Sequence, residues 1–238
     1  SGLREYEGFT ISDINAYNDS VSFSNGVTLH KGEVYGDSSQ ETMQRVQIRE
    51  TIASHFEKEK ELFSKGIKTL SLFFLDEVAN YKSYNEAGEE VKGKFWNIFE
   101  EEYTNYLNEN ISLFDDSYQQ YLRRFDVSQV HRGYFSIDKK TGHSIDSETK
   151  RGSDMSDDIS AYDLILKNKE RLLSFEEPCR FIFSHSALRE GWDNPNVFQI
   201  CTLRHANSAV AKRQEVGRGL RICVNQQGNR MDYQELGE

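Results

Sequence analysis

The sequence predicts an α/β protein built around an open, mainly parallel sheet. Two apolar strands are expected near residues 181–183 and 197–203, and a turn containing Gly191 and Asp193 lies between them. A helix is expected after the second strand, with Ser208 as a suitable N-terminal cap. This alternation is typical of parallel sheets, in which functional loops gather along one edge.

Residues 1–37 read as a β-rich lead-in of short strands and turns. Strands are expected at 9–11, 21–23 and 27–29, and the Asn25-Gly26 pair is a strong signal for a hairpin between the last two. Residues 38–238 then form the main domain.

The main domain opens with a long helix, expected over 39–65. Its apolar residues fall within an arc of about 120°; they are Ile48, Ile52, Phe56, Leu62 and Phe63. Lys65-Gly66 ends this helix, and 67–75 reads as a buried strand.

A polar stretch follows and carries helical patterns at 95–107 and 115–125, before a strand expected at 134–137. Residues 139–158 are rich in Ser, Gly, Asp and Lys, so a flexible loop is expected there. A short helix near 159–173 leads back to the sheet.

Charge is distributed unevenly along the chain. The formal net charge of -10 argues against binding nucleic acid by bulk electrostatics. Residues 204–230 nevertheless hold six basic side chains against one acidic one, whereas 76–126 hold twelve acidic against five basic. We interpret residues 80–130 as an acidic helical insertion with a different role from the basic C-terminal part.

The three cysteines, Cys179, Cys201 and Cys223, show no metal-ligand spacing. Buried thiols, no metal site and a reducing cytoplasm are therefore expected. We also expect no membrane segment and no signal segment. The chain begins with serine, from which we expect a piece of a longer polypeptide.

One helical face near the C-terminus carries chemistry. Gln214, Arg218 and Arg221 fall within an arc of roughly 60° on an ideal helix. Guanidinium groups keep their charge and present planar forks of donors, which suit an anion with several oxygens. A transferring phosphoryl group is such an anion.

These patterns resemble superfamily 2 helicases. The Gly-x-Asp turn resembles their motif V, and Gln-x-x-Gly-Arg-x-x-Arg over 214–221 resembles motif VI. The sequence of residues 183–199 closely resembles the restriction (Res) subunit of type III restriction-modification enzymes. It reads Phe-Ser-His-Ser-Ala-Leu-Arg-Glu-Gly-Trp-Asp-Asn-Pro-Asn-Val-Phe-Gln. Residues 70–76 resemble that family's motif IV, and 131–138 fit it too. The resemblance covers about residues 45 to 230.

The resemblance implies a RecA-like second motor lobe of the P-loop NTPase type. It implies that Arg221 is the arginine finger on the γ-phosphate, Arg218 its companion, and Gln214 a group that positions the phosphate or the attacking water. It further assigns Gly191, Asp193 and Gly217 to the nucleotide side. Ser186 and Arg189 are candidate DNA contacts, although surface charge is the simpler account of Arg189.

The family's partners and cofactors follow from the same resemblance. They are ATP and Mg²⁺, bound mainly by a first motor lobe of the same polypeptide, together with double-stranded DNA and a methyltransferase (modification) subunit. The first lobe and the nuclease domain are expected outside this chain, which by itself should be inactive.

Several lookalikes compete with this interpretation. The stretch from Gly88 to Lys94 imitates a P-loop, but Phe95 stands where Ser or Thr would bind magnesium. Asp76-Glu77 imitates a Walker B pair, Asp126 with Asp138-Lys139-Lys140 a nuclease site, and Ser184-His185-Ser186 a nucleophile. We interpret all four as structural, with a DNA-facing role also open for Asp76-Glu77.

Four functions stay open. The chain is part of a type III restriction enzyme, a lobe of another superfamily 2 translocase, or a partner-docking module. The last would use the aromatic residues of the acidic insertion, which fall at helical spacing: Phe95, Trp96, Phe99, Tyr103, Tyr106 and Leu107. A self-contained NTPase would instead need the Gly88 loop to bind nucleotide.

Overall fold

The computed structural model describes residues 8–31, 40–110, 117–138, 141–146, 169–185, 194–203 and 222–232. The chain divides into two compact units, Ser1–Met43 and Gln44–Glu238, which are described separately.

The first unit contains a three-stranded antiparallel sheet in the order β1 (Ile11–Asn15), β2 (Ser20–Phe23) and β3 (Thr28–His30). The expected hairpin is confirmed, since Gly26 adopts a φ of +83° in the turn between β2 and β3. The first strand starts at Ile11, two residues later than expected.

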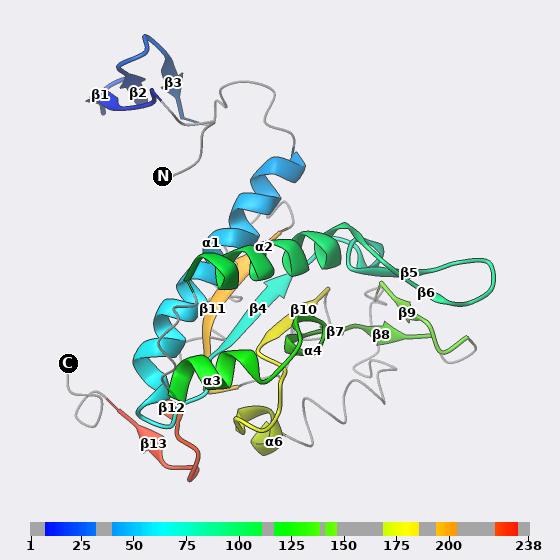
Figure 1. Ribbon diagram of the computed structural model, residues 1–238. Coiled ribbons are helices and arrows are strands. Elements are labelled where there is room, and N and C mark those ends of the chain that lie inside the picture. The colour runs from blue at the N-terminus through cyan, green and yellow to red at the C-terminus, as the bar shows by residue number, and fades with distance from the viewer. Residues whose placement is uncertain are drawn as a thin grey trace, which may run out of the picture. The chain divides into compact units, whose positions relative to one another are not determined.

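The second unit is built on a four-stranded parallel sheet in the order β11 (Val197–Thr202), β4 (Leu70–Phe74), β10 (Phe181–Ser184) and β7 (His131–Tyr134). The α/β class is confirmed, and the arrangement is consistent with a RecA-like fold (Figure 1). Every pairing in this sheet is parallel, so all four strands end at the same edge. We call this the carboxyl edge, and the opposite one the amino edge.

The expected strand at 134–137 was misplaced. The sheet strand is β7, while β8 (Ser136–Ile137) pairs antiparallel with β9 (Ser144–Ile145). β7 was hard to recognise because its sequence, His-Arg-Gly-Tyr, is polar, yet His131 and Tyr134 are buried. β9 also shows that part of the loop expected at 139–158 is ordered.

Helices cover both faces of the sheet. α1 (Gln40–Phe63), α2 (Lys94–Asn110) and α3 (Ser117–Arg123) lie on one face (Figure 1), where their apolar residues join Phe73, Phe181 and Phe183 in the main core. The other face packs Leu72 and Ile182 against α6 (Lys169–Leu173). The helices expected at 39–65, 95–107 and 115–125 are confirmed, with small shifts at their ends.

Gly66 caps the C-terminal end of α1 and leads into the parallel sheet. Gly66 adopts a φ of +70°, and its N–H donates to Phe63 O at 3.0 Å. Ile67 N–H reaches back to Leu62 O at 3.2 Å, and both residues lie in one small apolar cluster. This is the Schellman arrangement, and it turns the chain directly into β4.

Shorter elements complete the second unit. The 3-10 helix η2 (Val78–Asn80) and the hairpin β5 (Lys82–Tyr84) and β6 (Glu90–Lys92) follow β4, and α4 (Val127–Val130) precedes β7. The hairpin β12 (Cys223–Val224) and β13 (Arg230–Met231) is the last described element.

The three cysteines are free and buried, as expected. Among the described helices, none is both long and apolar enough to cross a membrane.

An aromatic cage holds His131 at the start of β7. Its ring lies among Trp96, Phe99 and Phe183, and its Nδ1 is 2.8 Å from Tyr81 Oη. Burial lowers the pKa of His131 to about 4, although the nearby Glu100 carboxylate opposes this. The folded protein therefore keeps this imidazole neutral.

The caged histidine predicts a pH-dependent stability. The unfolded chain binds a proton on this residue below its ordinary pKa of 6.5, whereas the folded chain resists protonation down to about 4. Stability is thus fully present above pH 6.5 and falls by up to about 3 kcal/mol as pH drops toward 4.

His131→Gln should flatten this slope in urea unfolding at pH 7, 6 and 5. It should not abolish the slope, because burial also lowers the pKa of His55. An unchanged slope in the variant would contradict this account.

Candidate functional site

The segments that carry the predicted motifs leave the sheet at its carboxyl edge. Segment 186–193 follows β10 and segment 204–221 follows β11, and these two strands flank β4. Leu75 N–H donates to Ser184 O at 2.9 Å, and Leu203 N–H donates to Phe74 O at 2.9 Å. The starting points of both segments are thereby fixed on either side of the end of β4.

The described chain resumes at Asn194, just before β11, and at Ile222, just before β12. Asn196, just before β11, accepts a hydrogen bond from Leu70 N–H at 2.9 Å and bonds through its side chain to Val224 in β12. The expectation that the functional loops lie along one edge concerns segments 186–193 and 204–221, which lie outside the described residues.

The predicted site residues themselves lie outside the described residues. They are Ser186, Arg189, Gly191, Asp193, Gln214, Gly217, Arg218 and Arg221. The structure describes the elements next to these residues: the ends of β10 and β11 at the carboxyl edge, and the hydrogen-bonded start of β11 at the amino edge.

The P-loop lookalike does not form a phosphate cradle. Residues Glu90–Lys92 are strand β6, paired with β5, so this stretch is one arm of a hairpin. Gly93 N–H donates to Tyr81 O at 2.7 Å, and a side chain at Gly93 would meet Asn80 O at 2.5 Å. A cradle needs several backbone N–H groups turned toward one anion, and these N–H groups are used inside the hairpin.

The paired carboxylates also have structural partners. Asp76 Oδ1 accepts from Glu77 N–H at 2.9 Å and from Asn80 Nδ2 at 2.7 Å, which stabilises the turn after β4. Asp126 donates its N–H to Gln129 Oε1 at 3.1 Å at the start of α4. The described residues contain no group of three or more His, Cys, Asp or Glu side chains suited to a metal ion.

The aromatic residues of α2 belong mostly to the core. Phe95 and Phe99 are fully buried and Tyr103 is 1% exposed, while Trp96, Tyr106 and Leu107 are partly buried against the same cluster. Because these side chains pack into the core of the second unit, few of them are accessible to a partner protein. The partner-docking hypothesis therefore loses its main support.

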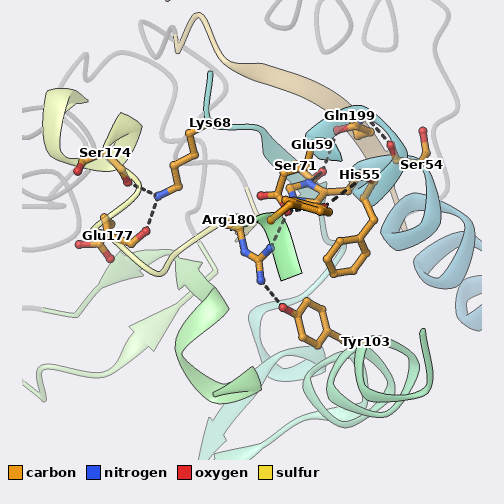
Figure 2. A network of polar contacts seen from close by, with 12 residues as sticks. Ser54, His55, Glu59, Lys68, Ser71, Tyr103, Ser174, Glu177, Arg180 and Gln199 are labelled. Atoms are coloured by element: carbon orange, nitrogen blue, oxygen red, sulfur yellow. Dashed lines mark hydrogen bonds and ion pairs between the residues drawn. The ribbon is translucent and has the colours of Figure 1, made fainter. Parts of the chain in front are cut away.

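A network of buried polar side chains lies near the amino edge, beneath α1 and α2 (Figure 2). Arg180, just before β10, donates from Nη1 to Glu59 Oε2 at 2.7 Å, and its other terminal nitrogen reaches Tyr103 Oη. Both charged side chains are 0% exposed. Tyr118 Oη donates to the same Glu59 oxygen at 3.0 Å, so α1, α2, α3 and β10 meet at one ion pair.

The charges of this pair stabilise each other. Burial raises the pKa of Glu59, but the Arg180 guanidinium outweighs it, and His55 adds to this effect. The pKa of Glu59 is consequently held at about 2. For Arg180, burial disfavours the charged form, but Glu59 more than compensates and raises its pKa. Both groups therefore stay ionised inside the core.

The network contains a Ser-His-Glu arrangement that sequence analysis missed. His55 Nδ1 lies 2.8 Å from Ser71 Oγ, and His55 Nε2 lies 3.5 Å from Glu59 Oε1. All three side chains are completely buried, and the Ser71 hydroxyl also reaches Gln199 Oε1 at 3.2 Å. A nucleophile without access to substrate has no catalytic use, so this is a structural lock.

A sequence signal for this lock existed. His55 and Glu59 are four residues apart and both fall inside the apolar arc of α1. On an ideal helix Glu59 lies about 20° from Ile52, and His55 lies about 20° from Ile48. Two ionisable residues on a face that must be buried require buried partners.

Lys68 forms a second buried anchor. Its ammonium group donates to the backbone carbonyl oxygens of Ser174 and Glu177 (Figure 2). Burial lowers the pKa of Lys68 to about 8, which nearby Cys179 and Glu177 partly offset. The contacts tie the start of β4 to the chain between α6 and β10.

Comparison with known proteins gives a consistent result. The chain is 41% identical over 214 residues to the Res subunit of type III restriction-modification enzyme EcoPI of Escherichia phage P1, covering 87% of this chain and 20% of that protein. It is 40% identical over 220 residues to the EcoP15I Res subunit of Escherichia coli (90% and 21%). The StyLTI Res subunit of Salmonella typhimurium is 34% identical over 272 residues (96% and 25%). No family model matches the chain.

The buried ion pair predicts an asymmetric response to mutation. Arg180→Met should cost about 3 to 5 kcal/mol of unfolding free energy, because it leaves Glu59 buried without its partner. Adding Glu59→Gln should recover much of that loss. Urea unfolding measures both, and Arg124→Met is a matched control, since the exposed Arg124–Glu176 pair should contribute nothing measurable. Equal costs for Arg180→Met and Arg124→Met would contradict this assignment.

Proposed function

We propose that this chain belongs with the Res subunits of type III restriction-modification enzymes and forms the second motor lobe of such a subunit. The chain spans about a fifth of the length of these relatives. In that role it would supply one side of a composite ATP site. The observation that carries the proposal is the identity of 34 to 41% over at least 87% of this chain.

The frame of the sheet supports this proposal. The segments that carry motif V and motif VI both start at the carboxyl edge beside β4 and both end near the hydrogen bonds between Asn196 and Val224. Segments whose two ends are fixed by hydrogen bonds to packed elements can hold charged groups in a fixed relation, which phosphoryl transfer requires.

Each motif residue is given a role on this basis. Arg221 is the arginine finger that stabilises charge on the γ-phosphate, and Arg218 is its companion. Gln214 orients the phosphate or the attacking water. Gly191, Asp193 and Gly217 form the nucleotide side of the coupling segments, and Ser186 with Arg189 contacts DNA phosphate.

The remaining parts of the ATP site belong elsewhere in the subunit. Because Gly88 to Lys94 is a hairpin arm followed by a helix, the phosphate cradle and the magnesium ligands have to come from another lobe. Bound ATP and Mg²⁺ would supply the phosphoryl group and the counter-charge. Double-stranded DNA, a modification subunit and a nuclease domain complete the proposed enzyme, in which ATP hydrolysis precedes DNA cleavage.

Arg221→Ala in the full-length Res subunit should lower DNA-dependent ATP turnover by about 10³- to 10⁵-fold while DNA binding stays nearly unchanged. Arg221→Lys should rescue poorly, because a point charge does not reproduce the guanidinium fork. The matched control is Arg213→Ala, in the same basic segment but off the motif face. Near-normal turnover in Arg221→Ala would refute the assigned role.

A further inference from the structure

The small sheet of the first unit has one apolar face. In an antiparallel sheet, residues directly opposite each other lie on the same face. Ile11 lies opposite Phe23. Ile14 and Leu29 both lie opposite Val21, and a bulge in β1 brings Ile14 onto the same face as Ile11. Together with Phe9, whose ring is 5.2 Å from that of Phe23, these residues form what we call the apolar sheet face: Phe9, Ile11, Ile14, Val21, Phe23 and Leu29.

The opposite face of the same sheet is polar. Asp13 and Thr28 both lie opposite Ser22, and the hydroxyl oxygens of Ser22 and Thr28 are 2.8 Å apart. The remaining paired residues of this face are Asn15, Ser20 and His30. This division is typical of an antiparallel sheet that packs against protein on one side and faces water on the other.

The first unit cannot cover its own apolar face. Within residues 8–31 no side chain of the apolar sheet face is buried, and Ile11 and Ile14 are 57% and 67% exposed. The first unit contains no cysteine, so no disulfide can stabilise it. A three-stranded sheet of this size needs such a link or a covering surface to be stable. The apolar sheet face therefore requires an apolar partner.

The sheet belongs to the part of the chain that resembles Res subunits. The match to the StyLTI Res subunit covers 96% of the 238 residues, which leaves out only about ten, so most of residues 8–31 fall inside it. The three matches cover 20 to 25% of the relatives. Three quarters or more of each relative therefore lies outside the match, and this long remainder is available to cover the sheet.

The chemistry of the apolar sheet face excludes DNA as the occupant. Residues 8–31 contain three charged side chains, Asp13, Asp19 and Lys31, and none of them belongs to this face. A DNA contact would need basic groups opposite the phosphates. An apolar face without charge is instead typical of the core of a permanent protein interface.

The area of the face favours an occupant from the same polypeptide. Three strands about 4.8 Å apart and at most about five residues long cover about 250 Å². A stable contact between separate proteins buries about 800 Å² on each partner. A contact within one polypeptide can be smaller, because the covalent chain removes most of the entropy cost of association.

We propose that the apolar sheet face docks onto an uncharged, apolar surface of the Res polypeptide outside the stretch that this chain matches. The two most exposed side chains of the face, Ile11 and Ile14, lie at the centre of that contact. The contact rests on the proposed membership of the Res subunits, and it does not depend on the roles proposed for Gln214, Arg218 and Arg221.

A photo-cross-linker at the position of Ile14 identifies the occupant. p-Benzoylphenylalanine is incorporated there in the full-length Res subunit, in complex with the modification subunit and duplex DNA, and the cross-linked peptides are mapped by mass spectrometry. We expect cross-links to Res peptides outside the matched stretch. The same group at Asp13, the neighbouring residue on the polar face, should give a yield at least about tenfold lower, since successive residues of a strand point to opposite faces.

Cross-links from position 14 to the modification subunit, to DNA or to residues 44–238 would overturn the proposed occupant. Equal yields from positions 13 and 14, or none from either, would overturn the docking surface itself. If Arg221→Ala keeps its ATP turnover while position 14 gives the expected cross-links, the proposed function fails and the docking surface stands.

Limited proteolysis of the full-length subunit gives a second measurement that needs no bulky probe. Ile14→Ser should speed cleavage within residues 8–31 about 10- to 100-fold, because losing a buried isoleucine favours the open state by about that factor. Asp13→Ser is the matched control and should change the rate by no more than about twofold. Equal cleavage rates for the two variants would show that Ile14 is uncovered in the whole subunit, which contradicts docking.

Discussion

The buried ion pair between Arg180 and Glu59 is the constraint around which the second unit is organised. Its partners reach α1, α2, α3 and the start of β10, and both charges are fully removed from water. A buried charge without its counter-charge is strongly destabilising, so the helices and the sheet have one favourable arrangement around this pair. With the face under α1 and α2 locked in this way, the strand ends become fixed points from which the motif segments extend.

The two edges of the parallel sheet anchor different parts of the chain. Segments 186–193 and 204–221 follow strands that end at the carboxyl edge, and at the amino edge the Asn196 side chain bonds the start of β11 to Val224 of β12. The buried network strengthens the amino edge because Ser71 and Gln199 join β4 to β11 there. Catalysis of phosphoryl transfer is mainly a matter of position and charge, so under the proposed function a rigid frame would help to place the two arginines.

Sequence alone predicted the elements that have a clear period or a clear end signal. α1 shows its apolar arc and ends at Gly66, and β4, β10 and β11 are short apolar runs. β7 was misplaced because His131 and Arg132 hide its strand character. The aromatic cage accounts for His131, and an ion pair with Glu177 accounts for Arg132. The hydrogen bonds between Asn196 and Val224 were beyond prediction, since these residues are 28 positions apart. The motif residues were recognised by resemblance, and their geometry lies outside the described residues.

The most direct test is to locate the terminal phosphate of ATP within the full-length subunit. An ATP analogue with a photoreactive γ-phosphate, bound with Mg²⁺ and cognate DNA, can be cross-linked and the modified peptides mapped by mass spectrometry. Our account predicts a cross-link within 204–221 of this chain, together with one in a separate lobe that holds the phosphate cradle. A cross-link at Gly88 to Lys94, or none within 204–221, would contradict the assignment of this chain as the arginine side of the ATP site.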